Sequence, residues 1–279
     1  MHRINLDSNI RLDLISDTSF NIKNSIINKH NIKIERAKVD LTISKKIHKR
    51  KGYYCSVFFE DITDLDSKKN IVKIFSFELK KLLKKKNLLK KPVLIIGLGN
   101  HYSTPDSLGP KVVDNIITTR HISLISDLDK KFSVVSKIAP GVFANTGIET
   151  FDIIKGIVDR IKPSYLLVID SLLSTSLDKL NRVIQLTDSG IDPGSGVGNQ
   201  RKEISKKTIG IDVIAIGVPT VVTLNTIVKD IMFEYDVDKI INNNSDNFLV
   251  TPKEIDFVIN DLSLVISQSI NNTVHNMTK

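Results

Sequence analysis

Short apolar runs separated by amphipathic stretches dominate the middle of this chain and predict alternating strands and helices. Amphipathic stretches at 110–119 and 147–162 predict helices. Because strands and helices alternate, the pattern indicates the α/β class, as a three-layer sandwich with a mostly parallel sheet. The apolar runs that predict strands buried on both faces span 93–96, 165–169, 182–186 and 213–216.

The pattern changes on both sides of this core, which we place at about 92–225. Partial alternation in 32–47 and an apolar run at 53–62 predict strands of an N-terminal β-rich layer at about 30–65. A helix is predicted at 69–91. The sequence Thr251-Pro-Lys-Glu predicts a last helix over about 251–269, with Thr251 as its cap and proline in the first helical position.

Composition places the chain among ordinary globular proteins, with 41% hydrophobic and 25% charged residues. No apolar stretch reaches the roughly 20 residues of a membrane helix, and the first residues lack the apolar segment of a signal peptide. Cys55 is the single cysteine, which excludes an internal disulfide. We therefore expect a cytoplasmic protein with no membrane partner.

The net charge of +9 raises the alternative of a nucleic-acid or phosphate-binding protein that is not an enzyme. Seven lysines fall within 80–91, between leucines that give this segment one apolar face. The lysines then form the solvated face of a helix. Direct nucleic-acid binding is therefore the less favoured interpretation.

Two aspartates follow predicted strands and are the leading candidates for chemistry. Asp106 lies in the loop after the first buried strand, and Asp170 directly follows 165–169. In an open α/β sheet, the loops at the carboxyl ends of the strands carry function. Two carboxylates brought together there could share a proton and activate water. Each also has a structural alternative, as a helix cap or a turn residue.

A glycine-rich loop at 187–199 offers a binding surface made of backbone N–H groups. It could hold an oxyanion, a phosphate or an extended peptide. A metal-dependent peptidase, with His101 joining Asp106 and Asp170 as a ligand, is a further alternative. The candidate substrate- or oxyanion-binding residues in the loop are Gly194, Ser195, Gly196, Gly198 and Asn199.

Several ordered motifs resemble the germination protease family of spore endopeptidases. The resemblance is dense over roughly 92–225 and looser at both ends. Its most specific motifs are Thr104-Pro-Asp-x-Leu-Gly-Pro-Lys111, Asp188-Ser-Gly-Ile191, Pro193-Gly-Ser-Gly-Val-Gly-Asn199 and Val250-Thr-Pro-Lys-Glu-Ile-Asp256.

This resemblance implies an endopeptidase of the spore core that degrades small acid-soluble spore proteins during germination. It implies a fold similar to the hydrogenase maturation proteases, a homotetramer, no cofactor, and catalytic aspartates at Asp106 and Asp170. It also implies synthesis as a zymogen that cleaves itself. The segment 11–15 resembles the propeptide cleavage site, with the cut between Asp13 and Leu14. Residues 1–13 are then a candidate propeptide and 14–279 a single protease domain.

Overall fold

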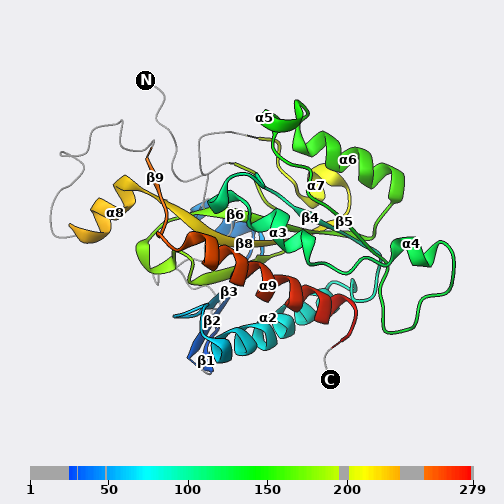
Figure 1. Ribbon diagram of the computed structural model, residues 1–279, viewed down its shortest axis with the longest axis horizontal. Coiled ribbons are helices and arrows are strands. Elements are labelled where there is room, and N and C mark those ends of the chain that lie inside the picture. Colours follow the sequence, from blue (N-terminus) through cyan, green and yellow to red (C-terminus); the bar gives the residue numbers. More distant parts are fainter. Residues whose placement is uncertain (1–24, 30, 48, 195–200, 233–247, 278–279) are drawn as a thin grey trace.

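One mixed sheet with helices on both faces forms the molecule (Figure 1). The computed structural model describes residues 25–29, 31–47, 49–194, 201–232 and 248–277. The strands are β1 (Ser25–Lys29), β2 (Ile32–Val39), β3 (Gly52–Phe58), β4 (Val93–Gly97), β5 (Val135–Ile138), β6 (Tyr165–Ser174), β7 (Val183–Thr187), β8 (Asp212–Thr223) and β9 (Leu249–Val250).

Helices of very different length connect these strands. The long ones are α2 (Leu65–Lys85), α6 (Thr150–Ile161) and α9 (Ile255–Val274). The shorter ones are α1 (Leu41–Ile47), α3 (Leu108–Asp114), α4 (Arg120–Ser123), α5 (Phe143–Thr146), α7 (Lys206–Ile209) and α8 (Leu224–Ile231), with single 3₁₀ turns η2 (Thr104–Asp106) and η3 (Leu177–Lys179). No helix in the described ranges is both long and apolar enough to cross a membrane.

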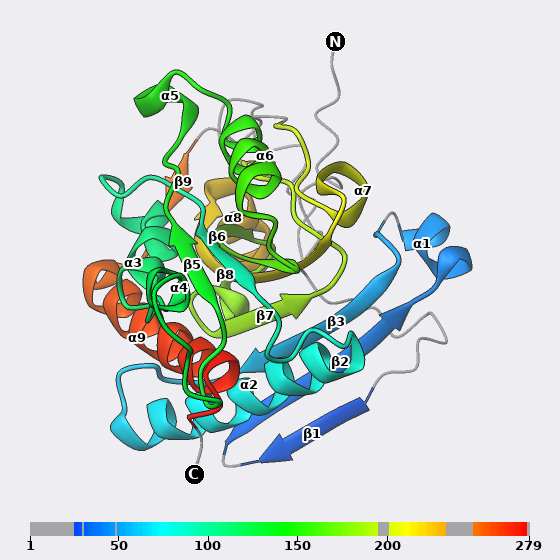
Figure 2. The ribbon, with the colours of Figure 1, turned by 90° about the vertical axis from the view of Figure 1, so that its right-hand side faces the viewer.

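The sheet has a parallel half and an antiparallel half, in the order β1-β2-β3-β7-β8-β6-β4-β5, with β9 beside β8. Strands β5, β4, β6 and β8 run parallel to one another. The predicted N-terminal strands continue this same sheet as its antiparallel half, because β3 pairs with β7 (Figure 2). The structure therefore confirms the α/β class and places the N-terminal β-rich region at one end of the central layer.

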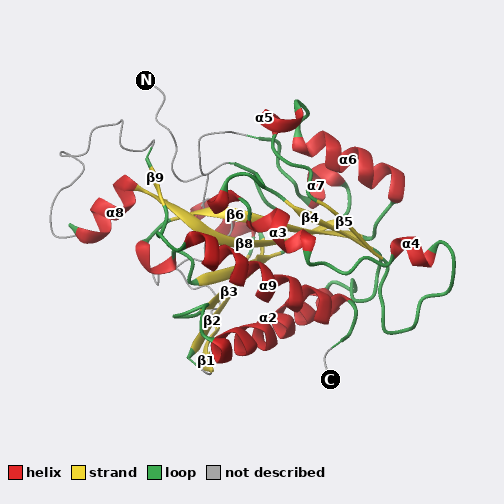
Figure 3. Ribbon diagram, in the orientation of Figure 1, coloured by secondary structure: helices red, strands yellow, loops and turns green. Residues whose placement is uncertain are grey.

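Three layers enclose two apolar cores (Figure 3). Helices α2, α3 and α9 cover one face, where residues such as Phe75, Val112 and Ile266 pack against the strands. Helices α6 and α7 cover the other face of the parallel half, through Phe151, Ile154 and Ile209. Burial on both faces explains why these strands have nearly continuous apolar sequences.

Several boundaries differ from the predictions for local reasons. The strand expected over 32–47 stops at Val39, because the Asp40 carboxylate accepts the N–H groups of Thr42 and Ile43 and starts α1. Helix α2 ends at Lys85 rather than residue 91. Helix α9 begins at Ile255, and Thr251 does not cap it; its hydroxyl instead donates to the Thr220 carbonyl at 2.9 Å.

Strand β6 is twice as long as predicted, and this extension shapes the functional end of the sheet. It continues from Tyr165 to Ser174, so Asp170 lies inside the strand rather than after it. Strand β4 stops at Gly97, opposite Ile169. Strands β6 and β8 therefore project beyond the end of β4.

Close backbone packing holds α3 against the ends of β4 and β6. A Cβ atom at Gly97 would collide with the carbonyl oxygen of Gly109. A Cβ atom at Gly109 would collide with the backbone of Leu98 and lie 2.8 Å from the Ile169 carbonyl oxygen. Only glycine permits this approach, which brings the loop before α3 directly over β6.

We expect Gly109→Ala to lower the free energy of unfolding by about 1–3 kcal/mol, because backbone must shift to admit the methyl group. Gly156→Ala is the matched control: it lies in α6 and has nothing within 4 Å of its Cβ position. That substitution should be neutral or stabilise by up to about 1 kcal/mol. Urea denaturation of both variants measures the difference, and equal stabilities would contradict the packing argument.

Candidate active site

The loop after β4 holds the first candidate aspartate in a defined position. The Asn100 N–H donates to Asp106 Oδ2 at 2.8 Å and faces the Asp106 carbonyl oxygen at 3.1 Å. Gly99 has φ of +113°, and a side chain there would strike the Asp106 backbone. Ser107 occupies the N-cap position of α3. Asp106 therefore does not cap this helix, and its carboxylate is held beside the strand ends.

The second candidate, Asp170, lies within β6 and is 6% exposed. Its Oδ1 atom accepts the N–H of Ser171 at 2.9 Å. The alternative that Asp170 caps a helix near 174–179 is wrong, since that segment forms strand and a single 3₁₀ turn. A carboxyl group buried in a strand is costly to ionise without a strong partner.

The electrostatics of the two aspartates are coupled. Burial raises the pKa of Asp106, while the Asn100 N–H and the positive charge of Arg201 act in the opposite direction. Burial raises the pKa of Asp170 well above its ordinary value, and the neighbouring Asp106 charge raises it further. The Ser171 N–H and Arg201 oppose these effects. Two such groups share protons as a unit, so one can be ionised while the other stays neutral.

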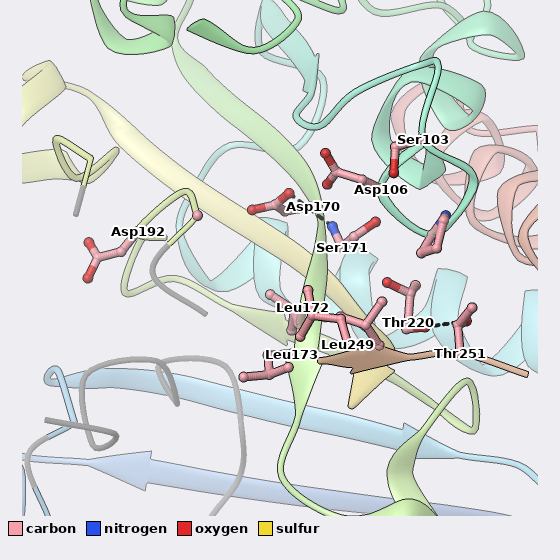
Figure 4. Close-up of a pocket in the computed structure, with 13 residues that line it drawn as sticks. Ser103, Asp106, Asp170, Ser171, Leu172, Leu173, Asp192, Thr220, Leu249 and Thr251 are labelled. Carbon is pink, nitrogen blue, oxygen red and sulfur yellow. Dashed lines mark hydrogen bonds between the residues drawn. The ribbon is translucent and has the colours of Figure 1, made fainter. Parts of the chain in front are cut away.

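Two cavities, of about 290 and 270 Å³, share both aspartates as lining residues, and Figure 4 shows the larger of the two. Ser103, Asp106, Asp170 and Gly194 line both. The larger cavity is also lined by Pro105, Ser171, Leu172, Leu173, Asp192, Thr220, Val221, Leu249 and Thr251. The smaller is also lined by Leu98, Gly99, Asn100, Gly141, Val142, Thr150, Pro193 and Arg201. A substrate chain passing through both cavities would present its middle to the carboxyl groups.

Other predicted site residues have different outcomes. Gly194 lines both cavities, with φ of +66°. His101 is exposed and lines neither cavity, so it is not brought to the aspartates. Within the described ranges, no group of three or more His, Cys, Asp and Glu residues could hold a metal ion. Ser195, Gly196, Gly198, Asn199, Asp13 and Leu14 lie outside the described residues.

The lysine-rich segment is placed away from these cavities. Lys81, Lys84 and Lys85 are exposed on α2, and none of the segment's lysines lines either cavity. Lys86 follows the helix and forms an ion pair with Asp188 at 2.8 Å. The predicted apolar face is confirmed, since Leu82, Leu83 and Leu88 are buried.

Sequence reasoning missed part of the site. Arg201 could have been recognised from the sequence, because it is the first basic residue after the glycine-rich loop. Leu172, Leu173 and Leu249 had none, because their role depends on how far β6 extends and on β9 pairing with β8.

A family model described as germination protease matches residues 15–240 of the chain. The chain belongs to the germination protease family. The family predicted from the sequence motifs is thereby confirmed, and it is a family of proteases.

Individual relatives agree with the family model. A germination protease of Clostridium acetobutylicum is 38% identical over 274 residues, covering 85% of this chain and 84% of the relative. One from Caldanaerobacter subterraneus subsp. tengcongensis is 39% identical over 276 residues, covering 86% and 84%. One from Geobacillus is 45% identical over 206 residues, covering 71% of this chain and 55% of the relative.

Among solved structures, a NiFe hydrogenase maturation protease, HycI from Thermococcus kodakarensis, matches with a TM-score of 0.34 and 16% identity. The match covers 65% of this chain and 94% of the HycI chain.

For this germination protease family member, Asp170→Asn should raise thermal stability at neutral pH. The folded-state pKa of Asp170 is raised, so the contribution of this carboxyl to wild-type stability is greatest below the ordinary aspartate range. It falls as pH rises towards the folded pKa, because ionisation then favours the unfolded chain. Asparagine does not ionise, so the variant does not lose stability in this way.

The difference in Tm between Asp170→Asn and wild type should therefore widen from about pH 4 towards neutrality. Asp178→Asn, at an exposed position in η3, is the matched control and should change Tm little at any pH. Thermal denaturation across a pH series measures this. A constant or shrinking difference would contradict the buried carboxyl.

Proposed function

We propose that this chain is an aspartate-dependent endopeptidase that begins the degradation of small acid-soluble spore proteins during germination. The observation that carries the proposal is the coupled pair, Asp106 and Asp170, at the junction of two cavities. Membership of the germination protease family supports the reaction type. Two cavities that share the pair would accommodate substrate on both sides of the cut, which suits cleavage within a chain rather than at its end.

The unequal environments of the two carboxyl groups suggest their roles. Asp170 has the more strongly raised pKa and keeps its proton. Asp106, which accepts an N–H from Asn100, is ionised and takes a proton from the attacking water. Asp170 donates its proton to the scissile carbonyl as the tetrahedral intermediate forms. Asp106 then returns its proton to the leaving amine, and Asp170 is reprotonated when the carbonyl reforms.

The glycine-rich loop would supply backbone N–H donors near the two aspartates. Gly194 borders both cavities and belongs to the glycine-rich loop that would hold the oxyanion or the substrate chain. By the same chemistry, the chain would process itself between Asp13 and Leu14, releasing residues 1–13. An acidic residue before that cut suits Arg201, the cation that lines the smaller cavity.

Asp106→Asn and Asp170→Asn should each lower kcat/KM for a small acid-soluble spore protein by at least about 10²–10⁴-fold, since each loses a proton-transfer group. Both should also abolish cleavage after Asp13. Mass spectrometry of the products and of the purified chain locates the cuts. Asp114→Asn, at an exposed position in α3, is the control and should cleave like wild type. Wild-type cleavage by either active-site variant would refute the assignment.

Arg201→Gln should move the acid limb of the pH–rate profile to higher pH. The guanidinium favours the ionised carboxylates, so its removal raises the pKa of both. Lys202→Gln is the matched control, because the Lys202 ammonium lies 3.9 Å from the centre of the Phe151 ring and lines neither cavity. Profiles of kcat/KM against pH test this, and an unshifted limb in Arg201→Gln would contradict it.

A further inference from the structure

One edge of β6 is left without a partner strand beside the candidate active site. On one side, β8 accompanies β6 through Ser174, with a register shift after Leu172. On the other side, β4 pairs only as far as Ile169. Among the described residues, no strand pairs with β6 on the β4 side beyond that point. The open edge begins at Asp170, the second aspartate of the coupled pair.

Strand alternation identifies the backbone groups on this edge. The Ile169 carbonyl accepts the Leu98 N–H at 2.8 Å, so the polar groups of Ile169 point towards β4. Alternate residues of a strand point the same way, which directs those of Ser171 and Leu173 towards the open side. The Ser171 N–H donates to the adjacent Asp170 carboxylate. By this alternation, the Ser171 carbonyl and both backbone groups of Leu173 face the open edge, where a further strand could pair with them.

A cavity lies along this edge rather than packed protein. Ser171, Leu172 and Leu173 line the 290 Å³ cavity, and Leu249 of β9 forms another part of its wall (Figure 4). Leu249 is 45% exposed, although it is a large apolar side chain. The cavity thus combines apolar side chains in its wall with the backbone donors and acceptors on the open edge of β6.

Two polar side chains in the same wall also have no partner. The hydroxyl oxygens of Ser171 and Thr220 are buried and make no hydrogen bond in the structure. Both residues line the cavity, and Thr220 is fully buried. Buried hydroxyls normally find partners, so these two add to the hydrogen-bonding groups that an occupant of the cavity would satisfy.

We propose that an extended segment of the substrate binds as an added strand along Ser171–Leu173 of β6. Its main chain hydrogen-bonds to Ser171 and Leu173, and its side chains alternate between the apolar wall of the cavity and the outside. This inference rests on the proposed peptidase function and deepens it. The occupant is a peptide segment without regular structure, bound mainly through its backbone.

The added strand would also place the bond to be cut. Strand pairing fixes register to one residue, because a slip by one turns every side chain to the other face. Asp170 is the residue next to the pairing segment, so the substrate peptide leaving the edge passes directly over the coupled carboxyls. Cleavage at a defined bond then follows from backbone register, together with Arg201 in the second cavity.

N-methylation of a peptide substrate tests the pairing without altering the enzyme. A short peptide spanning the cut in a small acid-soluble spore protein is made in versions with one N-methyl group at each successive position. On one side of the cut, kcat/KM should fall by about tenfold or more at every second position and by less than about threefold between them. A response without this two-residue period, as expected if a second copy of the chain occupied the edge, overturns the proposal.

Two variants at one position test the enzyme side. Leu173→Pro removes the N–H on the open edge, whereas Leu173→Ala removes the side chain and keeps that donor. The proline variant should have a higher KM than the alanine variant while kcat changes less, provided circular dichroism shows both folded. Equal KM values would contradict a role for the N–H, and the N-methyl series decides the matter if the proline variant misfolds.

The outcomes separate the two proposals. If the unmodified peptide is not cleaved, the proposed function fails. If that peptide is cleaved at one bond and the N-methyl series shows no alternation, the function stands and strand addition along β6 is wrong.

Discussion

Two neighbouring carboxyl groups, Asp170 buried and Asp106 half-buried, are the constraint on which the rest of this structure depends. Water is largely excluded from Asp170, and the neighbouring charge of Asp106 makes its ionisation still less favourable. Such a pair retains one proton over a pH range in which a single exposed aspartate has lost it. The site can therefore contain a general acid and a general base made from the same type of residue. Because the pKa of Asp170 is raised, ionisation of this carboxyl at higher pH disfavours the folded state.

Backbone packing makes this arrangement possible. The carboxyls meet because the loop after β4 turns tightly at Gly99 and α3 lies directly on the strand ends at Gly97 and Gly109. Side chains at these positions would push α3 outward and separate Asp106 from β6. The short β4 then leaves the end of β6 uncovered. The early end of β4 thus leaves room for the loop that carries Asp106. It also leaves an open edge of β6 next to Asp170.

The sequence predicted most of the central elements, because strands buried on both faces must be apolar throughout. The runs at 93–96, 165–169 and 213–216 were found for this reason. Helix α6 followed from its amphipathic pattern, and α9 followed from the Thr251-Pro-Lys-Glu start signal. Strands β1 and β5 were missed, since short strands at a sheet edge carry little apolar signal. The switch from β2 to α1 was missed because a single cap at Asp40 outweighs the partial alternation that continues through 40–47.

By itself, the sequence determined the fold class, the family and the identity of both candidate aspartates, since each of these depends on local patterns and ordered motifs. Only the tertiary structure decided that Asp106 and Asp170 meet, that His101 does not join them and that Arg201 acts on both. It also decided how far β6 runs past β4. The physical reason is that burial, charge coupling and strand register arise from segments distant in the chain, and no local pattern encodes their final separation.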